Sequence, residues 1–378
     1  PETELPISSP KPGWAEQHPD TWWEHVKNAA ARVRATADVD LREVGGIGIS
    51  YQMHGLVAVD HANRPLRPAI IWCDSRAVEI GARAFREIGP DICLEHLLNS
   101  PGNFTASKLR WVRENEPEIY RRIHKIMLPG DYIAMLMTGR TVTTPSGLSE
   151  GILWDFRKHD QAEFLLRHYD ISPDLLPEPA PTFSVQGELT PRAASELGMK
   201  SGTPVAYRAG DQPNNAFSLN VLNPGDIAAT AGTSGVVYGV ADTPVYDRRS
   251  RVNTFVHVND TKETPRYGIL LCVGGTGILN SWLRRTMAAG DEWDYQEMNA
   301  QAASVPIGAE GLVVLPYGNG AERTLGDRDP GCAMQGIRFN VHNRAHVLRA
   351  AQEGIVFALK YGLSIMNGIG VNARTIRA

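Results

Sequence analysis

Apolar and polar residues alternate with two different periods along the chain, and these periods predict helices and strands in turn. Apolar residues recur at helical spacing from Trp23 to Val33, which predicts a helix over residues 21–36. Thr21 and Glu24 have the spacing of a capping box at the start of that helix. Short apolar runs bounded by turn residues predict strands. The other elements expected in the first half are strands at 47–50, 56–60, 69–72, 185–189 and 204–208 and helices at 77–88, 105–115, 117–124, 129–137 and 191–198, with residues 104–168 mostly helical.

The second half continues the alternation of hairpins and helices. A strand pair at 226–230 and 236–240 is expected to form a hairpin with a Gly/Thr/Ser tip. Helices are expected at 214–221, 278–287, 293–303 and 344–367, the last one ended by Gly368, and a strand at 312–315. The pattern indicates an α/β protein of two domains, residues 1–215 and 216–378.

Composition narrows the class of protein. The 378 residues are 42% apolar and 21% charged, as in an ordinary globular protein. A net charge of -4 argues against nucleic acid as the main partner. No apolar run is long enough for a membrane span, no signal peptide is recognisable, and four scattered cysteines resemble reduced thiols. We therefore expect a cytoplasmic protein without a membrane or nucleic-acid partner. The oligomeric state is open, with a homodimer as one option.

The chain is organised around Asp211, which follows an apolar strand and Gly210. A carboxylate at a strand end with small neighbours can reach a ligand hydroxyl. The alternative is that Asp211 only caps the next helix or closes a turn, which is common for Asp after Gly.

Two Gly-rich turns are candidates for phosphate binding, Gly232–Gly235 (GTSG) and Gly274–Gly277 (GGTG). Glycines expose backbone N–H groups and Thr adds a hydroxyl, so such turns can hold phosphate oxygens without a lysine. Most turns of this composition are only turns. The common nucleotide fingerprints, GxxxxGKS/T and a GxGxxG after a strand, are absent.

Polar residues at strand ends form a second candidate set, suited to hydrogen-bond a polyol. Each member also has a structural interpretation: His54 as a surface or core histidine, and Arg76 as a partner of a nearby acid. The set comprises Gln52, Met53, His54, Asp74, Arg76, Lys108, Asp211 and Gln212.

Taken in order, these stretches resemble the FGGY carbohydrate kinases and, among them, the xylulokinases. The resemblance covers nearly the whole chain. It rests on Gly48–Gly55 (GISYQMHG), Arg67–Arg76 (RPAIIWCDSR), Gly102–Trp111 (GNFTASKLRW), Leu128–Tyr132 (LPGDY), Thr138–Gly139, Gly210–Gln212 (GDQ) and Gly232–Gly235.

The resemblance implies two domains of the actin-like ATPase (ribonuclease H-like) fold, with a sugar and Mg-ATP meeting in the cleft between them. Asp211 matches the catalytic aspartate, which takes the proton of the attacking hydroxyl and lies beside Mg²⁺. Met53 and His54 match the pair that lies against the ketose. The expected activity is ATP-dependent phosphorylation of a small sugar, D-xylulose first, to the 5-phosphate.

Further roles are carried over from the family residue by residue. Asp74, Arg76, Lys108 and Gln212 are expected to bind the substrate, and Arg76 is preferred over Lys108 as a sugar contact. The phosphate turns of the family match Gly232 and Thr233, with Gly275 and Thr276 near the nucleotide.

Several features depart from the xylulokinase pattern. Asp211 is followed by Gln212, as in glycerol kinases, and Trp72-Cys73-Asp74 replaces the usual Trp-Asn-Asp. Glycerol or ribulose therefore remains an alternative substrate. The family's Asp-x-Gly-Thr strand would precede Pro1 and its adenosine-binding Gly turn would follow Ala378. We expect an internal segment of a longer kinase, with weak ATP binding by itself. A non-catalytic sugar-binding member of the fold is a further alternative.

Overall fold

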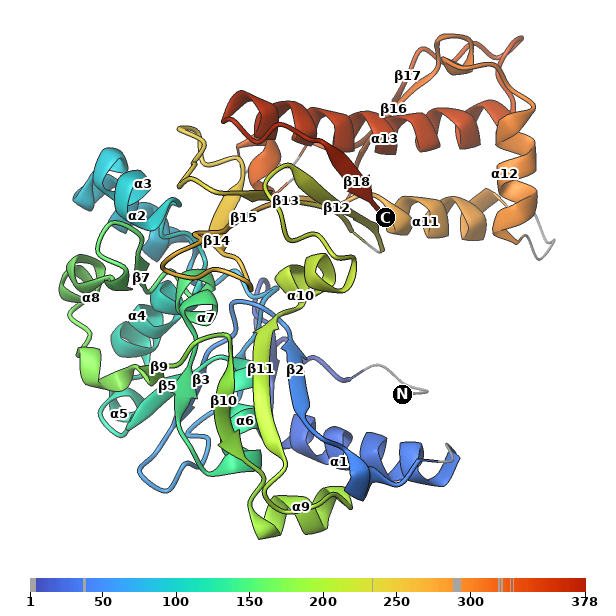
Figure 1. Ribbon diagram of the computed structural model, residues 1–378. Coiled ribbons are helices and arrows are strands. Elements are labelled where there is room, and N and C mark those ends of the chain that lie inside the picture. Colours follow the sequence, from blue (N-terminus) through green and yellow to red (C-terminus); the bar gives the residue numbers. More distant parts are fainter. Residues whose placement is uncertain are drawn as a thin grey trace. The chain divides into compact units, whose positions relative to one another are not determined.

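The computed structural model describes residues 5–36, 39–232, 234–287, 294–318, 320, 322–326, 328 and 330–378. The chain divides into two compact units. The first comprises Pro1–Asn215 and Phe255–Arg266, and the second Ala216–Thr254 and Tyr267–Ala378 (Figure 1). The expected boundary near residue 215 lies beside this division, and Phe255–Arg266 joins the first unit although its sequence position is within the second.

A three-stranded sheet lies at the centre of the first unit, in the order β10 (Phe183–Glu188), β11 (Pro204–Gly210), β2 (Ile47–Tyr51). β11 runs antiparallel to β10 and parallel to β2, with Gly210 opposite Tyr51. The carboxyl ends of β2 and β11 therefore lie side by side at one edge of the sheet. This register brings the residues after Tyr51 and the residues after Gly210 to the same place.

Helices α1 (Pro19–Thr36), α6 (Pro129–Thr138) and α9 (Pro191–Leu197) share one hydrophobic core with this sheet. Trp22 and Trp23 of α1 are buried in it. α1 begins at Pro19 and not at Thr21, so Thr21 lies within the helix and the expected capping box does not start it. Proline is favoured at the first helical position because its fixed φ suits the helix and it has no N–H to satisfy.

Short strand pairs and helices complete the first unit. Residues 104–168 are less helical than expected, because strands within this stretch pair with other segments of the unit. The pairs are β1 (Glu16–Gln17) with β4 (Ala69–Ile70), β3 (Val57–Val59) with β5 (Lys125–Met127), β6 (Val142–Thr143) with β9 (Glu178–Pro179), and β7 (Trp154–Asp155) with β8 (Asp160–Gln161). The helices are α2 (Val78–Ile88), α3 (Pro90–Leu97), α4 (Thr105–Asn115), α5 (Pro117–Tyr120), α7 (Pro145–Glu150) and α8 (Glu163–Tyr169), and α10 (Asp211–Ser218) leads into the second unit.

The second unit is built on strands β15 (Tyr267–Val273), β13 (Gly235–Ala241), β12 (Asp226–Ala231) and β18 (Thr375–Arg377), adjacent in that order. β14 (Asn253–Val256) is the neighbour of β15 on its other side and precedes it in the strand order. β12 and β13 form the expected hairpin, with Ala231 opposite Gly235. A pair of β16 (Val313–Tyr317) and β17 (Gly331–Gln335) packs with helices α11 (Gly277–Met287), α12 (Tyr295–Ala303) and α13 (Arg344–Gly368).

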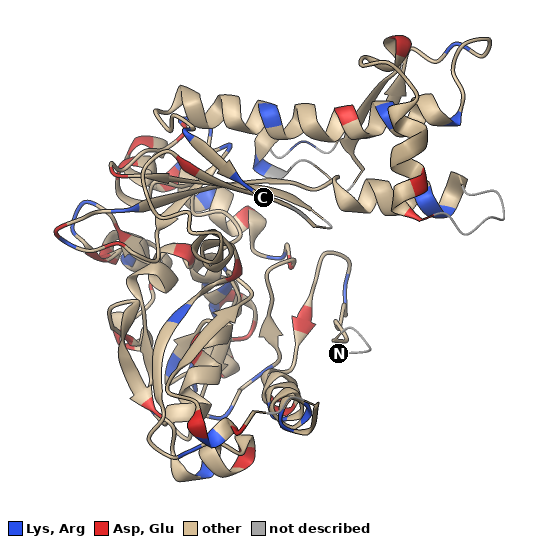
Figure 2. Ribbon diagram, turned by 45° about the vertical axis from the view of Figure 1, so that its right-hand side comes forward, with Lys and Arg blue, Asp and Glu red and all other residues tan. Residues whose placement is uncertain are grey.

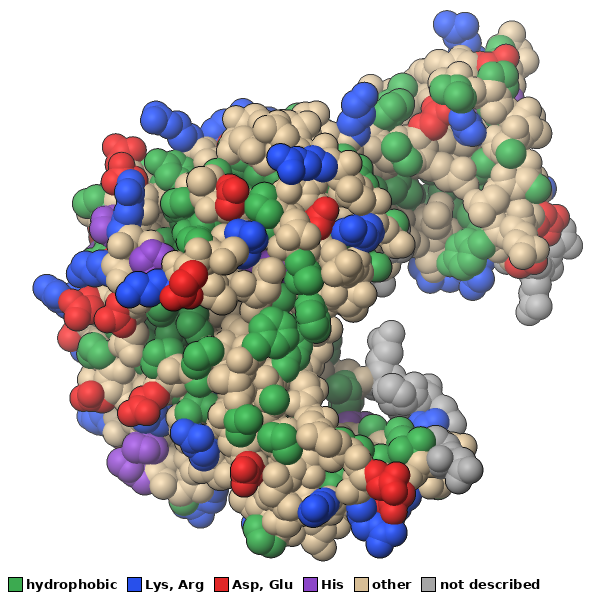
Figure 3. All heavy atoms as spheres, viewed as in Figure 1, with side chains coloured by type: hydrophobic (Ala, Val, Ile, Leu, Met, Phe, Trp, Pro, Cys, Tyr) green, Lys and Arg blue, Asp and Glu red, His purple; other side chains and the backbone are tan. Residues whose placement is uncertain are grey.

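The long helix expected at 344–367 is confirmed as α13, and the Asn343 side chain accepts from the Ala345 N–H at 3.0 Å. Acidic and basic residues are interspersed along the ribbon (Figure 2) and over the face of the molecule shown in Figure 3, in keeping with the small net charge. Within the described ranges, no helix has both the length and the apolar composition needed to cross a bilayer.

Candidate functional site

Asp211 lies at the end of β11, as the first residue of α10. Its side chain is half-buried, and burial raises the pKa of the carboxyl group above its usual value. Gln212 counteracts this shift, since its Nε2 donates to Asp211 Oδ2 at 3.1 Å. The N–H groups of Asp211 and Gln212 also favour the ionised form. Asp211 thus has the contacts of a helix start and remains a partly accessible carboxylate.

Met53 and His54 follow β2 and lie beside the end of β11. A Cβ atom built on Gly210 would lie 2.5 Å from Cγ of the buried Met53. Only glycine at position 210 lets the Met53 side chain approach the backbone this closely. The parallel register of β2 and β11 therefore places Met53 directly next to the residue that precedes Asp211.

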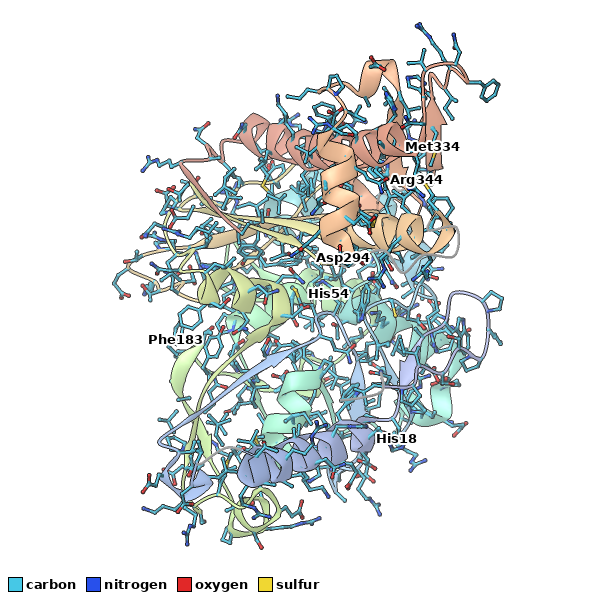
Figure 4. The ribbon with its side chains drawn as sticks, turned by 90° about the vertical axis from the view of Figure 1, so that its right-hand side faces the viewer. His18, His54, Phe183, Asp294, Met334 and Arg344 are labelled. Atoms are coloured by element: carbon cyan, nitrogen blue, oxygen red, sulfur yellow. The ribbon has the colours of Figure 1, made fainter. Side chains whose placement is uncertain are left out.

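His54 is held in one orientation by its backbone and its ring. It has a φ of 61°, in the left-handed region that non-glycine residues seldom adopt. Its ring Nδ1 lies 2.8 Å from the carbonyl oxygen of Glu150. Because a carbonyl only accepts, Nδ1 carries the hydrogen, and in the neutral ring Nε2 is the acceptor atom. The ring packs edge-on against Phe104, with centroids 4.7 Å apart, and tilted against Phe255 at 5.6 Å. His54 is labelled in Figure 4.

Lys108 contacts the main chain of His54. Its side chain is 0% exposed, and Nζ donates to the carbonyl oxygens of His54 and Ile71, at 2.9 Å each. Burial lowers the pKa of Lys108 to about 7. The sequence-based expectation was a substrate contact, whereas the structure gives Lys108 two backbone carbonyls of the first unit as partners.

Asp74 and Arg76 form a buried ion pair, with Arg76 Nη2 2.7 Å from Asp74 Oδ2 and both side chains at most 1% exposed. Arg76 Nη1 also lies 2.8 Å from Glu16 Oε1, and the guanidinium stacks 3.8 Å from the Trp14 ring centroid. Asp74 Oδ2 further accepts from the Ala15 N–H at 2.6 Å. In the structure both residues tie the N-terminal segment to the loop after β4, and they do not lie at a surface open to a ligand.

Glu150 is part of the site, although the sequence analysis did not single it out. It is the last residue of α7 and is 1% exposed. Its Oε2 lies so close to Gly210 that a Cβ at that position would overlap it. Burial, and the charges of Asp211 and Asp131, raise the pKa of Glu150 well above its usual value. No motif marks this residue; the one sequence signal is an acidic residue in the run of small residues that precedes Gly151.

Arg208 anchors β11 three residues before Asp211. Its side chain is fully buried, Nε lies 3.0 Å from Asp131 Oδ1, and Nη2 donates to the Val142 carbonyl at 2.8 Å. A buried arginine needs such partners, because an unpaired charge in the core is costly. This pair was also not predicted, since it depends on contacts between distant parts of the sequence.

In the second unit the two Gly-rich turns lie together. The Gly232 carbonyl accepts from the Gly277 N–H at 3.0 Å and from Thr276 Oγ1 at 3.2 Å. α11 begins at Gly277, so the positive end of an 11-residue helix lies at this turn. A Cβ on Gly275 would overlap the Pro316 carbonyl, which explains the glycine. Thr233 lies outside the described residues.

The donor chemistry of the two units fits the expected cofactor. The N-terminus of α11 beside a Thr hydroxyl suits phosphate oxygens. The Asp211 carboxylate is an oxygen ligand of the type that Mg²⁺ accepts alongside nucleotide phosphates.

Known proteins match the chain along nearly its whole length. Residues 1–218 match the N-terminal domain and residues 227–378 the C-terminal domain of the FGGY family of carbohydrate kinases. Xylulose kinase of Bacillus subtilis (strain 168) is 30% identical over 384 residues, covering 98% of this chain and 73% of its own length. Xylulose kinase of Escherichia coli (strain K12) is 29% identical over 377 residues, covering 98% and 74%.

A solved structure shows the same fold. The crystal structure of xylulose kinase from Rhodospirillum rubrum superposes with a TM-score of 0.87 at 29% identity, covering 98% of this chain and 74% of its own. The expected fold class, the two-domain α/β fold of actin-like ATPases, is thereby confirmed, and so is the expectation of a carbohydrate kinase. The chain belongs to the FGGY family of carbohydrate kinases.

Proposed function

We propose that this kinase transfers the γ-phosphoryl group of ATP to a small sugar, with Asp211 as the general base. D-xylulose is the preferred substrate and gives the 5-phosphate. One observation carries the proposal: the half-buried Asp211 carboxylate follows β11 at the edge where Met53 and His54 follow the parallel strand β2. The matched relatives that are xylulose kinases support the choice of sugar.

Asp211 has the properties that this role requires. Phosphoryl transfer depends mainly on positioning and charge stabilisation, and a carboxylate orients the attacking hydroxyl and accepts its proton. The raised pKa of Asp211 makes it a better proton acceptor than an exposed aspartate, while the hydrogen bond from Gln212 favours its ionised form.

The sugar contacts that we propose are Met53, His54 and Gln212. Met53 offers an apolar surface and His54 Nε2 an acceptor for a sugar hydroxyl, because its Nδ1 is engaged with Glu150. For Asp74, Arg76 and Lys108, which were expected to bind the sugar, we propose instead that they hold the loops carrying these contacts. Their buried pairs and carbonyl partners support this change of role.

Mg-ATP supplies the phosphoryl group when it is bound. We propose that Gly232, Thr233, Gly275 and Thr276 form the phosphate turn of the second unit, with the N-terminus of α11, and that Asp211 lies beside the metal. The hydrogen bonds that join Gly232 to Thr276 and Gly277 support one continuous turn. We further propose that the protein acts in the cytoplasm.

Glycerol or ribulose is the second candidate acceptor, and one contact favours it. Gln212, which donates to Asp211, stands where xylulokinases usually have asparagine and glycerol kinases have glutamine. The sugar next to Asp211 would therefore lie against a longer amide side chain.

The test is ADP release from Mg-ATP with D-xylulose, L-ribulose, D-ribulose, glycerol and gluconate, on the longest natural chain that contains this sequence. Release with D-xylulose above the other sugars supports the proposal. Release with another acceptor replaces the sugar but keeps the kinase, and no release with any of them contradicts the assignment of the acceptor class. Asp160→Asn, an exposed acidic residue of the first unit, serves as the matched control for Asp211→Asn.

A further inference from the structure

Glu150 is not a sugar contact in the function proposed above, yet its carboxyl group lies beside Gly210, the residue that precedes Asp211. It is 1% exposed, and the Tyr51 hydroxyl and the His54 N–H are the neighbours that lower the pKa of its carboxyl group, against the larger effect of burial. A buried carboxyl group costs free energy unless it is compensated, so its presence here calls for a reason.

Two contacts link Glu150 to both strand ends. Its main-chain carbonyl accepts from His54 Nδ1 at 2.8 Å, after β2. Its side-chain Oε2 fills the space that a Cβ atom on Gly210 would occupy, at the end of β11. Met53 Cγ borders the same space. One residue thus touches the loop that carries His54 and the residue that precedes Asp211.

We infer that Glu150 is a positioning residue for the sugar: it holds His54 through its carbonyl and braces Met53 and Gly210 through its side chain. The inference rests on the proposed function. Glu150 itself does not contact the sugar in this account, and it acts through the residues that do.

The local structure makes Glu150 a firm support. Thr144 caps α7, and its Oγ1 accepts from the Gly147 N–H at 3.0 Å. Next to Glu150, Ser149 Oγ donates to the Ser146 carbonyl at 2.7 Å and accepts from the Val256 N–H at 2.9 Å. The Gly151 carbonyl accepts from Ala106 at 3.1 Å. The end of α7 is therefore attached on both sides of Glu150, so the side chain has a fixed base.

The experiment compares Glu150→Ala and Glu150→Gln with the wild type, measuring KM for the sugar, KM for ATP and kcat. Alanine leaves a gap over Gly210 and Met53, and we expect the sugar KM to rise about tenfold or more with the ATP KM unchanged, since small misplacements are costly. Glutamine has the shape of Glu and should keep the sugar KM within about threefold.

Asp155→Asn is the matched control, because Asp155 is also a buried acid shortly after α7 but pairs with His96 at 3.0 Å. It should lower stability without changing the sugar KM. An Asp155→Asn effect on the sugar KM equal to that of Glu150→Ala would overturn the inference, as would an unchanged sugar KM in a folded Glu150→Ala protein.

A second measurement does not depend on activity. In protein labelled at the methionine methyl groups, the Met53 signal, identified with a Met53→Leu variant, should shift in Glu150→Ala and not in Glu150→Gln, because the Glu150 side chain borders Met53 at Gly210. An unchanged Met53 signal in Glu150→Ala overturns the inference. If no sugar is phosphorylated by the wild type, the proposed function fails by itself, and the Met53 signal still decides whether the Glu150 side chain braces this residue.

Discussion

Lys108 Nζ lies 2.9 Å from the carbonyl oxygen of His54, the residue that adopts a left-handed backbone conformation after β2. Such a conformation persists only when surrounding contacts hold it. The fully buried amine of Lys108 therefore holds the main chain of His54, while the carbonyl of Glu150 holds its ring.

Lys108→Met should lower sugar-dependent activity. The thioether matches the length of the lysine stem but cannot donate to the His54 and Ile71 carbonyls, so the loop loses a fixed conformation. We expect kcat/KM for the sugar to fall about tenfold or more, with KM for ATP unchanged. Steady-state kinetics measure this effect, and Lys200→Met, at an exposed lysine, is the control. Unaltered kinetics in Lys108→Met would show that the support is dispensable.

Lys108 should also shape the pH dependence of stability. Its pKa falls from 10.5 to about 7 on folding because of burial. Between these values the unfolded chain binds the extra proton, so the free energy of unfolding rises with pH by at most about 1.4 kcal/mol per unit. Lys108→Met should remove this slope in urea unfolding between pH 7 and 10. An identical slope in both proteins would place the titration elsewhere.

Activity should depend on pH through Asp211. A general base works in its ionised form, so kcat/KM for the sugar should fall about tenfold per pH unit below its pKa. Because burial raises the pKa of Asp211, this loss should begin at a higher pH than for an exposed aspartate. The pH–rate profile of the wild type measures the pKa. A profile that is flat down to the usual pKa of aspartate would argue against this environment for the base.

Arg76 should matter for stability more than for sugar binding. Arg76→Met leaves Asp74 buried without its cation, which costs about 3–5 kcal/mol for a pair of this kind. Urea unfolding measures the loss. Arg42→Met, which removes an exposed pair with Asp40, should leave stability unaltered. If Arg76 contacts the sugar directly, the sugar KM of the folded variant should rise strongly while its stability stays near that of the wild type.

Gly210 and Glu150 should be energetically coupled. A Cβ on Gly210 meets Glu150 Oε2 and Met53, so Gly210→Ala should be destabilising by about 1–3 kcal/mol. In the Glu150→Ala background the overlap with Oε2 is gone and only the one with Met53 remains, so the cost of Gly210→Ala should be smaller. A double-mutant cycle on unfolding free energies gives the coupling. Additive effects would mean that the two residues do not share this space.

Sequence reasoning singled out Met53, His54 and Asp211 as candidates because each follows an apolar strand. The structure adds that the two strands are parallel and that Gly210 pairs with Tyr51, so both strands end at the same sheet edge. The same reasoning could not tell on which side of the edge a polar side chain lies. Arg76 is near a strand end, but Trp14 and Glu16, about 60 residues earlier, give it partners in the interior.

Glu150 shows what local pattern cannot provide. Its importance arises from a glycine 60 positions later and a histidine 96 positions earlier, and neither relation leaves a period or motif in the sequence. The ends of helices were also hard to predict from local pattern. The capping box predicted a helix that starts at Thr21. α1 begins two residues earlier, at Pro19, because proline suits the first helical position.

The most direct test of the account is product formation from D-xylulose and Mg-ATP by the longest natural chain, followed by phosphorus NMR, in the wild type and in Asp211→Asn. The account predicts a sugar 5-phosphate with the wild type and a rate lower by about 10²–10⁴ with Asp211→Asn, in a variant that still binds the sugar. A comparable rate in Asp211→Asn would contradict Asp211 as the base, and absence of the 5-phosphate in the wild type would contradict the proposed reaction.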